Sequence, residues 1–229
     1  MEQEKNGLLK LSVSALAKYL LGLVSVGLLL FLPAGSIRYP HGWLFLGLLF
    51  GPMLILGIVL LIKSPDLLRK RLNAKEKQGT QRGVVALAGL FFVAGFVVAG
   101  LDFRYGWSSV PSWVVWIASA ILLISYGLYA EVMRENAYLS RTVEVQEGQK
   151  VVDTGLYALV RHPMYAVTLW LFLSIPLVFG SWWSLLCFAP YVVAILVRIE
   201  NEEKVLEEGL AGYGDYKKRV KYKIIPFLW

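Results

Sequence analysis

The stretch that decides the fold is RHPMYAVTLWLFLSIPLVFGSWWSLLCFAPYVVAILVRIENEE, residues 161–203. It contains two apolar runs, 164–179 and 182–197, which are separated only by Gly180-Ser181. This pattern predicts two membrane helices joined in a tight hairpin. Each run is shorter than the roughly 20 residues of a usual membrane span, so we expect short or tilted helices.

The hairpin carries charge at both of its ends. Arg161-His162 precedes the first run and Glu202-Glu203 follows the second, so a hairpin brings both pairs to one membrane face. Charge beside hydrocarbon is costly, and we expect these side chains to hold a charged ligand. The alternative is that the cations are interfacial anchors and the carboxylates belong to a solvated helix face.

The rest of the chain is similarly apolar. Of its 229 residues, 57% are hydrophobic and 17% are charged, whereas soluble domains have about 45–50% and about 25%. Six apolar blocks are long enough, or nearly so, to enter a bilayer: 11–32, 42–62, 83–101, 112–130, 164–179 and 182–197. We expect an all-α integral membrane protein of about six hydrophobic helices, with a C-terminal helical hairpin and a cytoplasmic cap helix.

Basic residues predict the orientation of these helices. With six crossings and a cytoplasmic N-terminus, the inner side holds every Lys and Arg except Arg38 and Arg104, which is 21 of 23. This skew follows the positive-inside rule and indicates that both termini are cytoplasmic. The net charge of +7 then lies in loops beside the membrane, which argues against a nucleic-acid partner. The first block exceeds the usual core of a signal peptide, about 7–15 residues, so we expect it to remain as a span.

Two parts of the chain are distinguished. Residues 1–130 hold two helix pairs joined by a basic inner loop at 63–82, and residues 131–229 form a core. In the loop, Ser64-Pro65-Asp66 predicts a helix start, and leucines among basic residues predict an amphipathic interfacial helix, with a solvated loop as the alternative. The single cysteine, Cys187, is interpreted as packing, and with two histidines it is too little to predict a metal site.

Pro163 suits the first turn of the helix that starts the hairpin, because its missing N–H would have no partner there. It also favours an extended backbone at His162. Arg161 and His162 then precede a helix N-terminus, whose unpaired N–H groups form a receptor for a carboxylate. Tyr165 adds a hydroxyl at the same depth.

The returning helix is expected to point its two carboxylates in different directions, because a helix turns by about 100° per residue. Arg198 and Glu202 are four residues apart and are expected to pair. Glu203 is then the freer carboxylate, able to take an ammonium or a ribose diol. Cations on one helix and a carboxylate on the next suit a zwitterion, such as an amino-acid head group.

A series of short motifs runs through the C-terminal core: Asn136-Ala137-Tyr138-Leu139-Ser140, Val151-Val152-Asp153-Thr154-Gly155-Leu156-Tyr157, Arg161-His162-Pro163-Met164-Tyr165, Glu202-Glu203-Lys204-Val205-Leu206, and then Tyr213, Tyr216, Val220 and Pro226. In this order they resemble the C-terminal core of the isoprenylcysteine carboxyl methyltransferase family, whose outline the phospholipid N-methyltransferases share. The resemblance covers about residues 131–229, and the first 130 residues resemble no family that we can name.

This resemblance implies S-adenosyl-L-methionine as the cofactor and a lipid-like or prenylated substrate that enters from the bilayer. The cofactor-binding residues expected on this basis are Gly155, Tyr157, His162, Pro163, Tyr165, Glu202 and Glu203. The expected catalytic residues are Arg161, Arg198 and Glu203.

Methyl transfer from a sulfonium is an in-line displacement that needs alignment and a dry pocket rather than a metal. With a carboxylate as acceptor, Arg161 is the expected orienting cation, because its fork matches a carboxylate, and Arg198 is the second choice. His162 would hold the carboxylate of the cofactor, and Glu203 its amine or ribose.

Aromatic side chains have competing interpretations. We expect either core or interfacial packing, or a wall beside the adenine or the lipid, for Tyr157, Tyr165 and Trp182-Trp183. For Tyr213, Tyr216 and Tyr222 we expect an amphipathic anchor against anionic lipid, in preference to a lid over the cofactor.

Two other protein classes stay open. Sterol reductases have a similar C-terminal module but use NADPH, and their usual larger number of helices argues against that class. A non-enzymatic transporter needs ionisable residues within several spans, whereas here they cluster at the cytoplasmic ends. We predict a membrane-bound methyltransferase, most simply one acting on a carboxyl group, and leave its methyl acceptor and its oligomeric state open.

Overall fold

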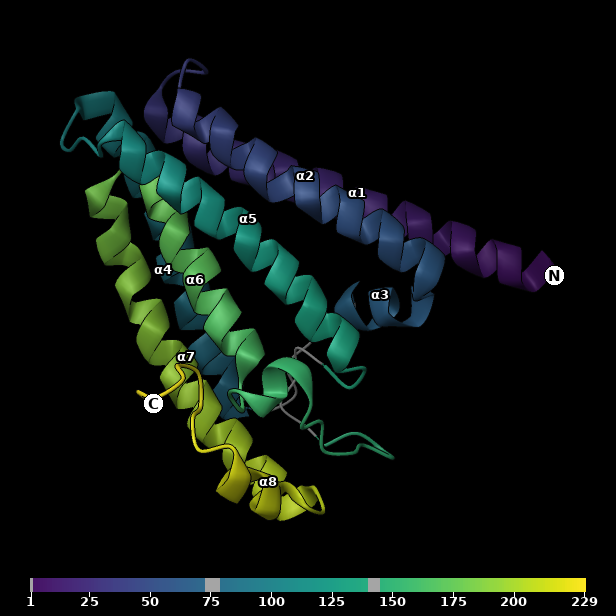
Figure 1. Cartoon of the computed structure of the whole chain (residues 1–229). Coiled ribbons are helices and arrows are strands. Elements are labelled where there is room, and N and C mark those ends of the chain that lie inside the picture. The colour runs from purple at the N-terminus through teal and green to yellow at the C-terminus, as the bar shows by residue number, and fades with distance from the viewer. Residues whose placement is uncertain (1, 73–78, 140–144) are drawn as a thin grey trace.

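The computed structural model describes residues 2–72, 79–139 and 145–229 and is built from helices (Figure 1). In chain order these are α1 Glu2–Ala34, α2 Pro40–Lys63, α3 Pro65–Leu72, α4 Gly79–Tyr105, α5 Ser112–Glu135, a 3-10 turn η1 Gly155–Ala158, α6 Pro163–Val178, α7 Trp182–Gly209 and α8 Tyr213–Arg219. These described segments contain no strand, which confirms the all-α class. Ser140, part of the first motif, lies outside them.

Among the described residues, four helices are long and apolar enough to cross a membrane: Gly7–Ala34 within α1, Pro40–Lys63, Ser112–Glu135 and Trp182–Gly209. Together with α4 and the shorter apolar α6, they make the six hydrophobic helices that the sequence predicts. At 1.5 Å per residue, the 16 residues of α6 reach only about 24 Å, so this helix is short as expected.

The expectation of a short second hairpin helix is wrong. α7 has 28 residues and continues past Val197 to Gly209. No proline or glycine interrupts the polar stretch after Val197, so the backbone hydrogen bonds of the helix continue beyond the apolar segment. This extension carries Glu202 and Glu203 on the same rigid helix that crosses the apolar layer.

The three bends between paired helices lie at one end of the molecule. The Tyr39 hydroxyl at the start of α2 donates to the Phe179 carbonyl in the hairpin bend at 2.7 Å. Asp102 near the end of α4 accepts a hydrogen bond from the Ser181 hydroxyl in the same bend. Gly180 has a φ of +75°, a conformation that glycine adopts without steric cost. The chain therefore runs back and forth three times, as the predicted helix pairs require.

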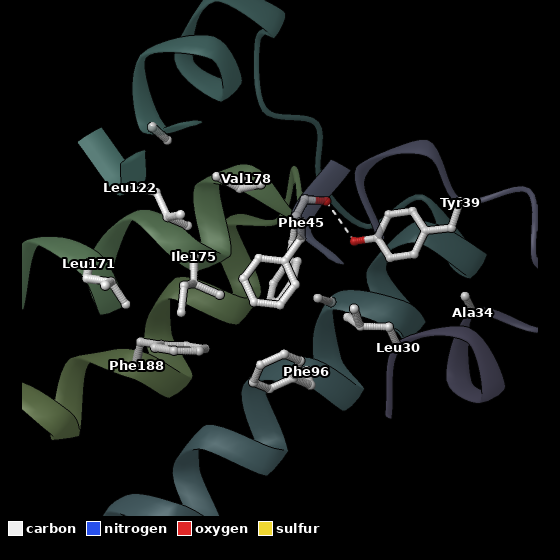
Figure 2. Packing of buried hydrophobic residues seen from close by; sticks show 13 residues of the cluster. Leu30, Ala34, Tyr39, Phe45, Phe96, Leu122, Leu171, Ile175, Val178 and Phe188 are labelled. Atoms are coloured by element: carbon white, nitrogen blue, oxygen red, sulfur yellow. Dashed lines mark hydrogen bonds between the residues drawn. The ribbon is translucent and has the colours of Figure 1, made fainter. Parts of the chain in front are cut away.

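The main core lies where these bends meet. Phe45 of α2 packs edge-on against Phe179, with ring centroids 4.6 Å apart, and Phe96 of α4 lies 5.1 Å from the same ring (Figure 2). Many other large apolar side chains face outward, among them Leu21, 67% exposed, and Ile55, 66% exposed. Apolar surface exposed on this scale is stable only in contact with lipid, as in a multi-pass membrane protein.

The predicted amphipathic helix is confirmed over the first part of the basic loop. Pro65 is the first residue of α3, and Leu68 on this helix is buried while Arg69 pairs with Asp66 at 2.8 Å. α3 lies beside the inner ends of α2 and α5 in Figure 1. The remainder of the loop, residues 73–78, lies outside the described residues.

Candidate active site

The site begins where the chain enters α6. Pro163 is the first residue of α6, as expected, and His162 caps it without a side-chain hydrogen bond. The segment after α8 pairs with this entry, because the Arg161 amide donates to the Tyr222 carbonyl at 2.9 Å and the His162 amide donates to the Lys223 carbonyl at 2.8 Å. The C-terminal tail therefore covers the residues that precede the hairpin.

Arg161 is held from both sides. Its Nε donates to Glu203 Oε1 of α7 at 2.6 Å, and its Nη1 donates to the carbonyls of Val220 and Lys221, each at 2.7 Å. Arg161 is 6% exposed and Glu203 is 3% exposed. Buried charges need this kind of pairing, so the pair ties the chain before α6 to the inner part of α7 and to the tail.

The expectation that Glu203 is the freer carboxylate is wrong. Besides Arg161, it contacts His162 Nε2 through Oε1 at 3.1 Å and Lys217 Nζ through Oε2 at 3.4 Å. Its lone pairs are already used by groups of the protein. Sequence spacing could not reveal this, because the partners come from the entry to α6 and from α8.

Glu202 takes a different direction, as the helix geometry requires. It accepts a hydrogen bond from the Tyr165 hydroxyl of α6, and Arg198 Nε donates to that same hydroxyl at 2.9 Å. Tyr165 thus links the two α7 side chains that the sequence expected to pair with each other.

A cavity lies between the entry to α6, the inner part of α7 and the tail. Its empty volume is about 830 Å³, including the solvent-open mouth. Of the predicted site residues, those in its wall are Tyr157, Arg161, His162, Tyr165, Arg198 and Glu202. Three other predicted site residues are not part of the lining: Gly155, Pro163 and Glu203. Both ends of the hairpin therefore contribute to one cavity, which opens to solvent.

Tyr213 of α8 is the most informative wall residue that the sequence did not assign to the site. It is 4% exposed, and its hydroxyl has no hydrogen-bond partner among the described residues. Burial, and then the charge of Glu203, raise the pKa of this hydroxyl well above its ordinary value, so it stays a neutral donor. An unpaired buried hydroxyl in a cavity wall is a candidate donor to a bound ligand or water.

The prediction that the tail tyrosines anchor the protein to lipid is wrong for two of the three. Tyr216 is buried like Tyr213, and its hydroxyl donates to the Tyr157 carbonyl at 2.8 Å. The Tyr157 hydroxyl accepts from Asn136 Nδ2 at 2.9 Å, and burial raises the pKa of Tyr157 to about 12. These contacts support the alternative, in which the tail covers the cavity.

Gly155 sets the position of Tyr157. Its φ is +54°, and a Cβ at this position would lie 1.6 Å from Glu135 Oε1. Both carboxylate oxygens of Glu135 accept the Leu156 amide, at 3.1 and 2.9 Å. Only glycine allows the chain to turn here against the end of α5 and to start η1.

Two further corrections concern apolar groups. Trp182 lies at the opposite end of α7, where its amide donates to Ser108 Oγ at 3.1 Å, so the tryptophan pair does not wall the cavity. Leu206 and Leu210 do line it. They follow Glu202 at intervals of four residues, so helical spacing along a longer α7 would have identified them.

Comparison with solved structures shows that the fold is similar to that of one intramembrane enzyme. The structure of the eukaryotic intramembrane Ras methyltransferase ICMT, isoprenylcysteine carboxyl methyltransferase, superposes with a TM-score of 0.52 over 90% of this chain and 73% of that chain, at 18% sequence identity. The match extends well into the first 130 residues, where the sequence resembled no family.

Residues 113–212 match the family of phospholipid methyltransferases. The uncharacterized protein YpbQ of Bacillus subtilis is 33% identical over 98 residues, which are 42% of this chain and 58% of that protein. The Delta(14)-sterol reductase of Mus musculus is 29% identical over 99 residues, 38% of this chain and 22% of the reductase. The chain therefore spans only part of these relatives, and the predicted resemblance of its C-terminal core is confirmed.

Proposed function

We propose that this protein is a membrane-bound methyltransferase that uses S-adenosyl-L-methionine and acts on a lipid-like or prenylated substrate, most simply on a carboxyl group. The observation that carries the proposal is the cavity between the two ends of the hairpin. It combines a carboxylate, a histidine and an unpaired buried hydroxyl, in a chain with the fold of an intramembrane methyltransferase.

The residues of the cavity suit the proposed cofactor. Its amino-acid head is a zwitterion, which needs an acceptor for the ammonium and donors for the carboxylate. Glu202 is the acceptor in the wall, and the Tyr213 hydroxyl is a donor; His162 adds a second donor in its imidazolium form, because its Nε2 contacts Glu203. Leu206 and Val152 give the wall an apolar part that suits an adenine.

When bound, this cofactor would supply an electrophilic methyl group on sulfur. Transfer of that group to a substrate carboxylate would ask the protein for alignment and a dry pocket, with no proton transfer by a side chain. Arg161 and Arg198 both line the cavity and both are engaged: Arg161 donates to Glu203 and to two carbonyls, and Arg198 Nε donates to the Tyr165 hydroxyl. We assign Arg161 and Glu203 the task of holding the wall in place.

The orientation of the protein is part of the proposal. The cavity lies at the end of the bundle that carries most of the basic residues, which the positive-inside rule assigns to the cytoplasm. The cofactor would enter from the cytoplasm and the lipidic substrate from the bilayer, with both termini on the cytoplasmic side.

Isothermal titration calorimetry of the purified protein with S-adenosylhomocysteine tests the proposal. We expect S-adenosylhomocysteine to bind. Tyr213→Phe should weaken its affinity about fivefold, which corresponds to the loss of roughly one hydrogen bond. Tyr222→Phe is the matched control, because the Tyr222 ring packs on Phe227 outside the cavity, and it should bind like the native protein. NADPH is titrated in parallel, since one relative is a sterol reductase. Binding of NADPH without binding of S-adenosylhomocysteine would refute the proposal.

A further inference from the structure

Arg71 on α3 is a partly buried cation that the site described above does not use. Its Nη1 donates to the Tyr129 hydroxyl of α5 at 3.2 Å, and its guanidinium carbon lies 5.6 Å from the centre of that ring. Its Nε and Nη2 are buried and have no hydrogen-bond partner among the described residues. An arginine with two buried and unpaired donors is costly unless an anion completes it.

The position of Arg71 connects it to the proposed active site. Leu67, one turn earlier on α3, packs on the apolar cluster that contains Tyr157 and Met164, and both of these residues line the cavity. Residues four apart share a helix face, so Arg71 faces the same side as Leu67. Burial raises the pKa of Tyr157 to about 12, and the charge of Arg71 opposes this rise, as expected for neighbouring groups.

The surroundings also indicate what kind of molecule carries the anion. α3 lies at the inner ends of α2 and α5, where apolar side chains face outward: Ile62 is 74% exposed and Leu128 is 40% exposed. A molecule whose anion reaches Arg71 can place its apolar tail along these helices in the bilayer. A free, fully water-soluble anion would gain nothing from this surface.

We propose that Arg71 and Tyr129 form the anion subsite for the lipid-like substrate, so that the substrate is an acidic amphiphile held by its carboxylate or phosphate. The identification of the ligand as the substrate rests on the proposed function, whereas the anion-binding site itself does not. Arg71 offers two parallel donors, which match the two oxygens of such a group, and it lies on the side of the cavity wall formed by Tyr157. Arg71 thereby gives the segment that joins the two helix pairs a role in substrate selection.

The test compares a farnesylated carboxylic acid with its uncharged methyl ester. N-acetyl-S-farnesylcysteine and its methyl ester are titrated into the full-length protein in nanodiscs, and dioctanoyl phosphatidic acid serves as the phosphate probe. We expect the carboxylate to bind at least about tenfold more tightly than the ester. We expect Arg71→Gln to abolish this difference. Arg69→Gln is the control, because Arg69 is on the same helix but is paired with Asp66 and half-exposed, and it should retain the difference.

Each outcome has a distinct meaning. Equal binding of acid and ester by the native protein overturns the subsite without any variant, even if Arg71→Gln fails to fold. An acid preference that survives Arg71→Gln overturns it as well. Loss of phosphatidic acid binding in Arg71→Gln, with no effect on the farnesyl acid, would overturn the substrate assignment and identify a phospholipid site instead. S-adenosylhomocysteine binding, measured on the same samples, should stay within about twofold in Arg71→Gln. Its absence in the native protein would refute the methyltransferase and leave the anion subsite standing.

Discussion

Single buried side chains hold this site together. Arg161 and His162, at the entry to α6, and Glu203, on α7, lie within one hydrogen-bonded cluster that joins these two segments. Glu203 lies outside the cavity lining and holds Arg161 and His162, which line the cavity together with Glu202, Tyr213 and Arg198. This division between supporting and lining residues is what the structure adds to the two charged pairs that the sequence displays.

Removal of Arg161 should destabilise the fold strongly. Arg161→Ala leaves Glu203 buried without its main partner, and we expect a loss of about 3–5 kcal/mol in the free energy of unfolding. The double variant Arg161→Met, Glu203→Leu removes both charges. Its loss in the free energy of unfolding should therefore be clearly smaller than the sum of the losses of Arg161→Met alone and Glu203→Leu alone. Denaturation in detergent followed by circular dichroism measures these values. Additive losses would contradict a coupled pair.

Gly155 gives a second residue-scale prediction. Gly155→Ala forces a Cβ into the Glu135 carboxylate and strains a positive φ, a penalty of roughly 1–3 kcal/mol for the backbone alone. We expect lower thermal stability and weaker S-adenosylhomocysteine binding, because Tyr157 shifts. Gly148→Ala is a useful control: it has a positive φ as well, but nothing lies within 4 Å of its Cβ position. Equal effects on binding would show that the Glu135 contact is unimportant.

At the scale of elements, one carboxylate joins two of the bends between paired helices. Asp102 is 1% exposed and accepts from the Ser108 amide at 2.7 Å, the Ser108 hydroxyl at 2.6 Å and the Ser181 hydroxyl. It therefore connects the end of α4, the turn before α5 and the hairpin bend. The cavity lies at the other end of these helices.

Asp102→Ala should separate stability from ligand binding. Hydrogen bonds to a charged group contribute roughly 1.5–3 kcal/mol each, so we expect a marked fall in thermal stability. Below the new melting temperature, S-adenosylhomocysteine affinity should change by less than about twofold, because distant sites rarely couple. Asp215→Ala, which removes an exposed pair with Lys218, should leave both quantities nearly unchanged. A large loss of affinity in Asp102→Ala would show that the outer end controls the cavity.

The elements themselves were predictable to the extent that apolar runs mark them. Gly180-Ser181 between two such runs was enough for the hairpin, and Ser64-Pro65-Asp66 was enough for the start of α3. The polar helix that continues α7 to Gly209 was predictable as well, because Gly209 is the first glycine after Arg198; the full length of α7 was not, because its apolar run alone is short. The place of Tyr213 depends on pairing between the tail and residues 161–162, which is non-local and has no sequence signature.

For the whole molecule, the account requires one orientation in the membrane. In a Cys187→Ala background, Ser109→Cys lies in an outer turn and Ala211→Cys lies beside the cavity, and both native residues are exposed. A membrane-impermeant maleimide should label the Ser109→Cys protein in intact cells and the Ala211→Cys protein only after lysis. The reverse pattern would place the cavity outside and contradict cytoplasmic delivery of the cofactor.

The central claim is that the two ends of one hairpin and the folded-back tail enclose a single cofactor site. Electron cryo-microscopy of the protein in nanodiscs with saturating S-adenosylhomocysteine tests it most directly. We predict density for the ligand between His162, Glu202 and Tyr213, with its head group within hydrogen-bonding distance of the Tyr213 hydroxyl. Density for the ligand elsewhere, or a cavity without ligand at saturation, would contradict the account.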